Sequence, residues 1–310
     1  GRAVKDKVYE PDWRSAERVD YTLRLARILA DLLPEDVDGG ISTSPISYKP
    51  WLNAQERREA LEHGAIHLAL LTAALAQLRD QTDRLIHVDI EPEPNCLLEN
   101  MQETVGFFCN WLLPRGGNVM IVDDLLDHIR VCYDTCHFAV EYENPSQVFW
   151  KLAENGIRIG KIQISSALRV PLPQDLQRRE HLSELIQPFA ESTYLHQVVE
   201  RTVDGTLQHY LDLPDALPNI MDRNAEEWRI HYHVPVFAES FGGLDSTQAD
   251  TADALDVAKA MRCCPHLEIE TYTWEVLPPE LNLSLADSLQ REYEWVLAQF
   301  AVPVAAQEVE

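Results

Sequence analysis

An alternation of apolar and polar residues predicts that the segment 85–91 is a strand with two unlike faces. Positions 86, 88 and 90 are isoleucine, valine and isoleucine, whereas positions 87, 89 and 91 are histidine, aspartate and glutamate. Successive side chains of a strand point to opposite sides, so the two sets lie on opposite faces. In a barrel the apolar face packs outward on helices, and polar groups on the inner face are costly unless they are paired or bind metal.

Segments with strand character alternate with amphipathic helices along the whole chain. The strand candidates lie at 41–47, 85–91, 130–137, 159–165, 229–237 and 267–273. The spacing of apolar residues predicts helices near 15–33, 53–80, 97–113, 123–128, 144–156, 178–190, 248–262 and 284–300. This alternation predicts a parallel sheet whose strands are joined by crossover helices.

We expect this α/β sheet to be a (β/α)8 TIM barrel. Six strand candidates are visible, whereas a closed barrel needs eight. The chain opens on a helix with no strand before it, so two or more N-terminal strands are expected to be absent from this numbering. An open doubly wound sheet is the alternative, but the chain has neither a G-x-G-x-x-G motif nor a P-loop.

The expected domain organisation is one N-terminally incomplete barrel over 1–310, with a loose C-terminal tail at 301–310. A β-hairpin insertion is expected near 194–213, because Asp204-Gly205 favours a tight turn between two strand-like runs.

Composition and charge exclude several classes of partner. The chain carries 26 Lys and Arg residues against 51 Asp and Glu residues, for a net charge of −25. This balance argues against nucleic acid and against an anionic membrane surface, although a small anionic substrate needs only a few cations. No apolar run approaches the roughly 18 residues of a membrane span, and the start does not look like a signal peptide. The six cysteines form no Cys-x-x-Cys pair, so we expect a reducing, cytoplasmic location.

Carboxylate and imidazole side chains occur at or beside the ends of four strand candidates. They are Glu91 or Glu93, Asp134 with His137, His231 or His233, and Glu268 or Glu270. Any one of them alone would more often be a structural group, but ligands of parallel α/β folds gather at the carboxyl ends of strands. Oxygen and imidazole ligands without thiolate suit a divalent Mn, Fe, Co, Zn or Mg ion.

Lys161 and Gln163 share one face of the strand candidate at 159–165. They are candidates for contacting a substrate hydroxyl or phosphate, and a polar barrel interior explains them about as well. Glu268 and Glu270 share a face of the last strand, so one is expected to bind the ion and the other to pair with it.

At these residues the chain resembles the xylose isomerase-like TIM-barrel superfamily of sugar isomerases, epimerases and metal-dependent endonucleases. Glu91 matches the superfamily's first glutamate, Asp134-Thr-Cys-His137 its Asp-x-x-His element, and Glu270 its last glutamate. The superfamily's intervening histidine falls near Gln163, which is a departure. His231 or His233 is the candidate replacement, since the endonuclease branch uses an additional ligand pair between those strands.

A closer resemblance, to the EboE family of metabolite-traffic proteins, covers almost the whole chain. The resembling stretches are Glu91-Pro-Glu-Pro94, Tyr133-Asp-Thr-Cys-His137, Lys161-Ile-Gln-Ile-Ser-Ser-Ala-Leu-Arg169, Tyr194-Leu-His-Gln197, His231-Tyr-His-Val-Pro235 and Glu268-Ile-Glu-Thr-Tyr-Thr-Trp274. The resemblance implies a place in a bacterial Ebo cluster, which is linked to export or maturation of a secondary-metabolite precursor. It implies other proteins of that cluster as partners and no particular reaction.

The leading expectation is a metal-dependent isomerase or epimerase of a small polyhydroxylated or cyclitol-like metabolite. Glu91 and Glu270 would hold the ion and act as acid and base, with Asp134 and a histidine completing the ligand set and His137 as ligand or orienter. Glu93, Lys161, Gln163 and Glu268 are the candidate substrate contacts. The alternatives are metal-assisted phosphoester hydrolysis and a non-catalytic binding or scaffold protein of the same pathway.

Overall fold

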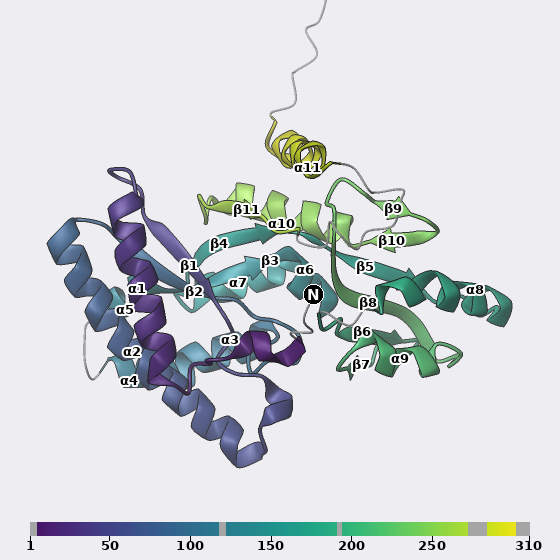
Figure 1. Ribbon diagram of the computed structural model, residues 1–310, viewed down its shortest axis with the longest axis horizontal. Coiled ribbons are helices and arrows are strands. Elements are labelled where there is room, and N and C mark those ends of the chain that lie inside the picture. Colours follow the sequence, from purple (N-terminus) through teal and green to yellow (C-terminus); the bar gives the residue numbers. More distant parts are fainter. Residues whose placement is uncertain (1–4, 118–121, 191–193, 272–283, 302–310) are drawn as a thin grey trace, which may run out of the picture.

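The protein consists of two β-sheets that lie side by side and are covered by helices (Figure 1). The computed structural model describes residues 5–117, 122–190, 194–271 and 284–301. One sheet has five strands, which all pair in parallel, and the other has six strands, which all pair antiparallel. The mixed α/β class expected from the sequence is confirmed. The strands form two sheets instead of one continuous sheet.

The parallel sheet contains the strands expected at five of the six candidate segments. In spatial order they are β1 (Gly39–Thr43), β2 (Ile86–Ile90), β3 (Ile129–Asp134), β4 (Ile159–Ile164) and β11 (Leu267–Ile269). Neighbours in space are therefore also neighbours in chain order within this sheet. Right-handed crossovers then place the connecting helices on one face, and the sheet curls into a half-barrel around the other. The expected closed eight-stranded barrel stays a prediction.

Most helices lie at the expected segments, whereas the short helices Thr135–Val140 and Leu213–Ala216 form where no helix was expected. Their bounds are α1 (Ala16–Leu32), α2 (Ala54–Thr82), α3 (Met101–Phe107), a π-helix (Phe108–Leu112), α4 (Leu113–Gly116), α5 (Val122–His128), α6 (Thr135–Val140), α7 (Pro145–Glu154), α8 (Leu176–Ile186), α9 (Leu213–Ala216), α10 (Gln248–Met261) and α11 (Leu285–Phe300). Ser15, Asn53 and Asn144 cap α1, α2 and α7 as their side chains accept hydrogen bonds from backbone N–H groups.

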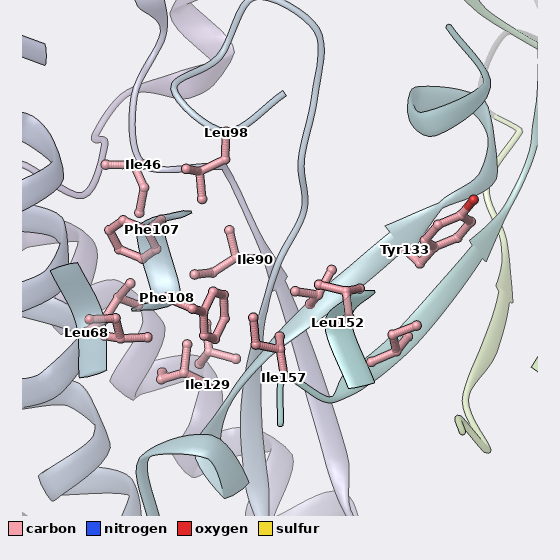
Figure 2. Close-up of a cluster of buried hydrophobic side chains, with 14 of the residues drawn as sticks. Ile46, Leu68, Ile90, Leu98, Phe107, Phe108, Ile129, Tyr133, Leu152 and Ile157 are labelled. Carbon is pink, nitrogen blue, oxygen red and sulfur yellow. The ribbon is translucent and has the colours of Figure 1, made fainter. Parts of the chain in front are cut away.

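The row of apolar positions on the parallel strands faces the helices, as the alternation predicted. Ile86, Val88 and Ile90 are buried in one cluster with residues of β3, β4 and the helices. Figure 2 shows Ile90 and Ile129 beside Phe107, Phe108 and Leu68 of the covering helices. The polar side chains that alternate with these apolar positions consequently line the concave face of the parallel sheet. Both sites described below lie on that face.

Two expected elements differ from the structure in their limits. The strand candidate at 41–47 ends at Thr43, and the chain then turns through Ile46, whose φ is 74°. The candidate at 130–137 ends at Asp134, which caps α6, so His137 lies on a helix. The stretch 272–273 and the tail beyond Ala301 lie outside the described residues.

The antiparallel sheet corrects the expectation that segment 229–237 is a barrel strand. Its order is β7 (Leu207–Tyr210), β6 (Val198–Thr202), β8 (Ala225–Val234), β5 (Ser166–Pro171), β10 (Leu244–Ser246) and β9 (Ser240–Phe241). The predicted hairpin is confirmed as the β6–β7 pair, with Gly205 at φ 85° in its turn. Residues of β8 are buried almost without interruption, and burial on both faces does not reveal which sheet a strand joins.

Among the described residues, one helix, α2, is long and apolar enough to cross a membrane by length and composition alone. The core helix of a globular protein can pass the same test. Here α2 buries Leu68, Leu71 and Leu75 in the cluster that covers the parallel sheet.

A buried carboxyl group on the last helix connects it to both sheets. Glu292 of α11 is fully buried, and its Oε1 accepts hydrogen bonds from Thr271 Oγ1 at 2.7 Å and from the backbone N–H of Val236 at 3.2 Å. Burial raises its pKa from 4.5 to about 7, and the two hydrogen bonds only partly offset this. Glu292 is therefore a group whose ionisation opposes folding at alkaline pH.

We expect Glu292→Gln to stabilise the protein at pH 8.5 and to leave it unchanged near pH 4. The native carboxyl binds its proton up to about pH 7, whereas the unfolded one releases it near 4.5, so stability is lost as pH rises through that window. The amide removes this loss, which amounts to up to about 3 kcal/mol. Urea unfolding at both pH values measures the difference. An equal effect of the substitution at pH 4 and pH 8.5 would contradict the assigned titration.

Candidate functional site

A cavity of about 430 Å³ opens at the carboxyl ends of the parallel strands and extends to β8 of the neighbouring sheet. Its wall includes five of the predicted ligands or acid–base residues and one predicted substrate contact. These are Glu91, Glu93, His137, His231, His233 and Glu270. Asp134 lies fully buried beside them at the end of β3. The structure thus brings together the residues that the sequence placed at four separate strand ends.

Three imidazole rings converge at the floor of this cavity. His231 Nε2 lies 3.0 Å from His137 Nε2 and 3.2 Å from His233 Nε2. His137 comes from α6, and the two others come from β8, where they are two residues apart and share one face. Although β8 belongs to the antiparallel sheet, it still brings His231 and His233 to His137, because its carboxyl end reaches the rim of the parallel sheet.

The hydrogen bond at Nδ1 of each ring determines whether Nε2 carries a proton or a lone pair. His137 Nδ1 lies 3.0 Å from the carbonyl oxygen of Pro92, and His233 Nδ1 lies 2.6 Å from the carbonyl oxygen of Glu270. His231 Nδ1 lies 2.8 Å from Gln197 Oε1, and Gln197 Nε2 donates to the Pro94 carbonyl. All three acceptors require a proton on Nδ1, which leaves a lone pair on each Nε2 of a neutral ring.

Burial favours the neutral state of His137 and His231. Burial lowers the pKa of His137 to about 4, with His233 adding to the shift and Asp134 opposing it. Burial, followed by the charges of His137 and His233, lowers the pKa of His231 well below 6.5. Lone pairs facing one another at about 3 Å repel, and a cation between them removes the repulsion.

Asp134 adds an oxygen to the same point. Its Oδ1 accepts hydrogen bonds from Cys136 N at 2.6 Å and Ser165 Oγ at 2.8 Å. Its Oδ2 lies 3.7 Å from His137 Nε2 and 4.0 Å from His233 Nε2. The carboxyl groups of Asp134 and Glu270 share a hydrogen bond, so a protonated Glu270 can donate to Asp134 when no cation is bound.

The glutamates of the site are held in their protonated form without a cation. Burial, and then the charges of Asp134 and Glu91, raise the pKa of Glu270 to about 12. The pKa of Glu91 is raised well above 4.5 by burial, Asp134 and Glu93. Burial also raises the pKa of Asp134, but the nearby His137 and His233 outweigh it and bring the value to about 2. Ionised and protonated carboxyl groups thus lie side by side, which is the pairing that acid–base chemistry uses.

Glu93 faces the cavity with partners that sequence reasoning missed. Tyr9 donates a hydrogen bond of 2.6 Å to Glu93 Oε1, and His231 Nδ1 lies 3.8 Å from the same oxygen. Burial raises the pKa of Glu93 to about 7, while hydrogen bonds from Tyr9 and Gln197 limit the rise. Gln197 lies within the Tyr194–Gln197 stretch noted above, whereas Tyr9 stands in a lead-in segment with no signal of its own.

The remaining predicted substrate residues lie in a different cavity. Lys161, Gln163 and Glu268 line a pocket of about 460 Å³ between α1, β1 and the β4–β11 edge. Lys161 Nζ is 2.6 Å from Glu268 Oε2, and Gln163 Oε1 accepts from Cys132 Sγ at 2.8 Å. Gln163 therefore does not stand with the three histidines, and the position of the superfamily's intervening ligand is not filled from β4.

Comparison with known proteins adds no relative to this picture. No family model matches the chain, and no curated protein matches it significantly. The class of protein that the fold and the site define is therefore an α/β protein with a cluster of three histidines and an aspartate at the carboxyl ends of its parallel strands.

Proposed function

We propose that this chain is a metal-dependent isomerase or epimerase of a small polyhydroxylated metabolite. The observation that carries the proposal is the meeting of three imidazole Nε2 atoms and the Oδ2 of Asp134 at one buried point. Cys136 Sγ lies within 4.8 Å of ligand atoms of His231 and His233, but burial raises the pKa of this thiol well above its usual range. Nitrogen and oxygen donors fit a divalent Mn, Fe, Co or Zn ion better than Mg, which prefers oxygen alone. His137, His231, His233 and Asp134 would hold the ion.

A bound divalent ion supplies Lewis acidity to substrate oxygens that face it. Glu91 and Glu270 lie on the cavity wall beside this point and can hold and return the proton of an adjacent carbon. The Nδ1 hydrogen bonds to Pro92, Gln197 and Glu270 keep the rings oriented, as second partners do at other metal centres. Glu93, with a pKa of about 7, is a further proton carrier, so its role extends the substrate contact expected from the sequence.

The charge around the cavity favours a neutral substrate over a phosphoester. The described cations on its wall are Lys5 and Arg18, and Lys5 Nζ lies 2.5 Å from Asp212. Glu91, Glu93 and Glu270 oppose a phosphate dianion unless they remain protonated. Phosphoester hydrolysis is accordingly the second candidate, and a binding or scaffold protein is the third.

The proposal also includes the complete fold, the family, the location and the wider role of the protein. A closed (β/α)8 barrel of the xylose isomerase type, membership of the EboE family, a cytoplasmic location and a role in metabolite traffic are what the sequence resemblance implies. Chain-order pairing of the parallel strands and a site at their carboxyl ends support a barrel-like protein. Partners from the same biosynthetic cluster remain part of this proposal.

The first test is the metal content of the purified protein by plasma mass spectrometry, with His231→Gln as the site variant and the exposed His181→Gln as the matched control. We expect the parent and His181→Gln to hold metal at the histidine cluster and His231→Gln to lose it. Equal metal content in all three folded proteins would overturn the site.

The second test addresses the reaction class. The metal-loaded protein is incubated in D₂O with a panel of aldoses, ketoses and cyclitols, and carbon-bound deuterium is read by NMR. Incorporation that is lost in Glu270→Gln supports proton transfer at carbon. A metal-loaded protein that exchanges no proton but hydrolyses small phosphoesters supports the second candidate, and one that does neither supports the binding protein.

A further inference from the structure

A second cluster of metal-type side chains lies at the opposite ends of the parallel strands. Asp38 precedes β1, His87 stands within β2, and His266 precedes β11. His266 Nε2 lies 2.6 Å from Asp38 Oδ1, and His87 Nε2 lies 3.6 Å from Asp38 Oδ2. Glu91 follows β2 and lies four positions after His87, so the two clusters are roughly 13 Å apart along the strand.

His87 is oriented in the manner of a metal ligand. Its Nδ1 lies 2.6 Å from Oδ1 of Asp89, a carboxylate that is fully buried like His87 itself. The carboxylate favours the proton on Nδ1, which turns the lone pair of Nε2 toward Asp38. Within the described residues neither His87 Nε2 nor Asp89 Oδ2 has a hydrogen-bond partner. His87 Nε2 is therefore a buried acceptor that faces Asp38, and the ligand atoms of Asp38, His87 and His266 all lie within 4.8 Å of one another, where a cation would satisfy it.

The backbone around this pair leaves room for no other side chain. A Cβ atom on Gly160 of β4 would lie 1.9 Å from Asp89 Oδ1, and one on Gly40 of β1 would lie 2.3 Å from Asp89 Oδ2. The neighbouring strand β1, and β4 on the far side of β3, therefore carry glycine where the carboxylate of Asp89 lies. The space is used by the His87–Asp89 pair rather than by apolar packing.

The charges of the cluster also fit a divalent ion. Arg130 Nη1 donates to Asp38 Oδ2 at 3.0 Å, so one guanidinium stands against the two carboxylates of Asp38 and Asp89. The side chains of Asp38 and His266 are each 26% exposed, which leaves a path for an ion from solvent. Two imidazoles with a carboxylate are a donor set that zinc favours.

We propose that Asp38, His87 and His266 form a second divalent-cation site of the zinc class, separate from the histidine cluster in the cavity. Its three ligands lie just before the first strand, within the second strand and just before the last strand in the order of the parallel sheet. An ion there joins the two edge strands of the curled sheet at their amino ends and stabilises the half-barrel. The role is structural and does not depend on the reaction assigned to the other site.

The test is the zinc stoichiometry of protein first stripped with a chelator and then titrated with Zn²⁺. We expect two equivalents in the parent and in His181→Gln, and one equivalent in each of His266→Gln and His231→Gln. Bound zinc is counted by plasma mass spectrometry after gel filtration, and circular dichroism verifies the fold of each variant. His266 is half-buried rather than enclosed, so its substitution leaves the interior intact.

A stoichiometry that His266→Gln leaves unchanged would overturn the second site, whatever His231→Gln does. Conversely, loss of an equivalent in His266→Gln but not in His231→Gln would retain the second site and refute the proposed metal centre of the cavity. The melting temperature gives an independent reading, because zinc should raise it in the parent and raise it less in His266→Gln.

Discussion

Asp134→Asn is expected to lower the affinity of the cavity for a divalent ion at least 100-fold while leaving the metal-free protein folded. The loss follows because the substitution removes the carboxylate of the four-residue donor set, whose Oδ2 lies 3.7 Å from His137 Nε2. The retained fold follows because asparagine caps a helix as well as aspartate does, and Asp134 Oδ1 accepts the hydrogen bonds from Cys136 N and Ser165 Oγ.

The same substitution should keep or raise the stability of the metal-free protein. The new amide N–H₂ group would occupy the position of Oδ2, from which it can donate toward the Nε2 lone pairs of His137 and His233. Metal-free protein would then have a further donor at this point, beside the protonated Glu270. We expect a melting temperature equal to or higher than that of the stripped parent, and a much smaller rise on adding metal.

Competition with a chelating dye measures the affinity, and calorimetry measures the melting temperature. Asp175→Asn is the matched control, because Asp175 caps α8 through a hydrogen bond from Gln177 N and lies far from the histidines in the chain. Unchanged affinity in Asp134→Asn would exclude Asp134 as a ligand. Loss of folding in Asp134→Asn but not in Asp175→Asn would assign the aspartate a purely structural role.

The chemical character of the site could be predicted from the sequence because strands have a period of two. The polar residues at the alternating positions 87, 89 and 91 predict that one face of this buried strand is polar. Asp134 was recognisable as a strand end followed by a turn. What could not be predicted is distance: no pattern along the chain states that the Nε2 atoms of His137 and His231, 94 residues apart, lie within hydrogen-bonding distance.

Strand direction is the second property that the pattern does not contain. Segment 229–237 was correctly expected to hold a strand, but β8 runs antiparallel to both of its neighbours, β5 and β6. β5 follows β4 directly after Ser165. In the sequence, a strand that passes from the parallel sheet into a second sheet has the same residue pattern as a strand that is followed by a loop. For a related reason the pattern does not say that Lys161 and Gln163 line a second cavity away from the histidines, since facing the concave side does not specify the end of the sheet.

Partners brought from distant loops were missed altogether. Asp38 and His266 are 228 residues apart, and each precedes a strand rather than following one. The expectation that ligands gather at carboxyl ends of strands directed attention away from them. Gly160 carries the clearest retrospective signal, because a glycine inside a strand often marks a close approach of another group, here the Asp89 carboxylate.

Arg179→Met is expected to destabilise the protein by about 3–5 kcal/mol, the largest effect that we predict for a single side chain. Arg179 of α8 is fully buried, and its guanidinium donates to five backbone carbonyl oxygens. They belong to Pro173, Ile220, Asp222, Leu172 and Ala225. Methionine fills similar volume but donates no hydrogen bond, so these oxygens lose a partner together in the interior.

The adjacent residue provides the control. Arg178 has a side chain that is 78% exposed, and its nearest acid, Asp175, is 4.0 Å away. Arg178→Met should therefore change the free energy of unfolding by less than about 0.5 kcal/mol. Urea unfolding of the two variants compares identical substitutions one position apart. Equal stabilities would show that the five carbonyl contacts contribute nothing net, and that α8 is held by its apolar contacts alone.

The consequence of Arg179→Met for the cavity follows from where the five carbonyls lie. Leu172 follows β5 and Ala225 begins β8, the strand that carries His231 and His233 at its other end. If β8 is positioned mainly by its pairing with β5 and β6, metal affinity in native conditions should stay within about threefold of the parent despite the lower stability. A larger loss would mean that the buried guanidinium also sets the position of the histidines.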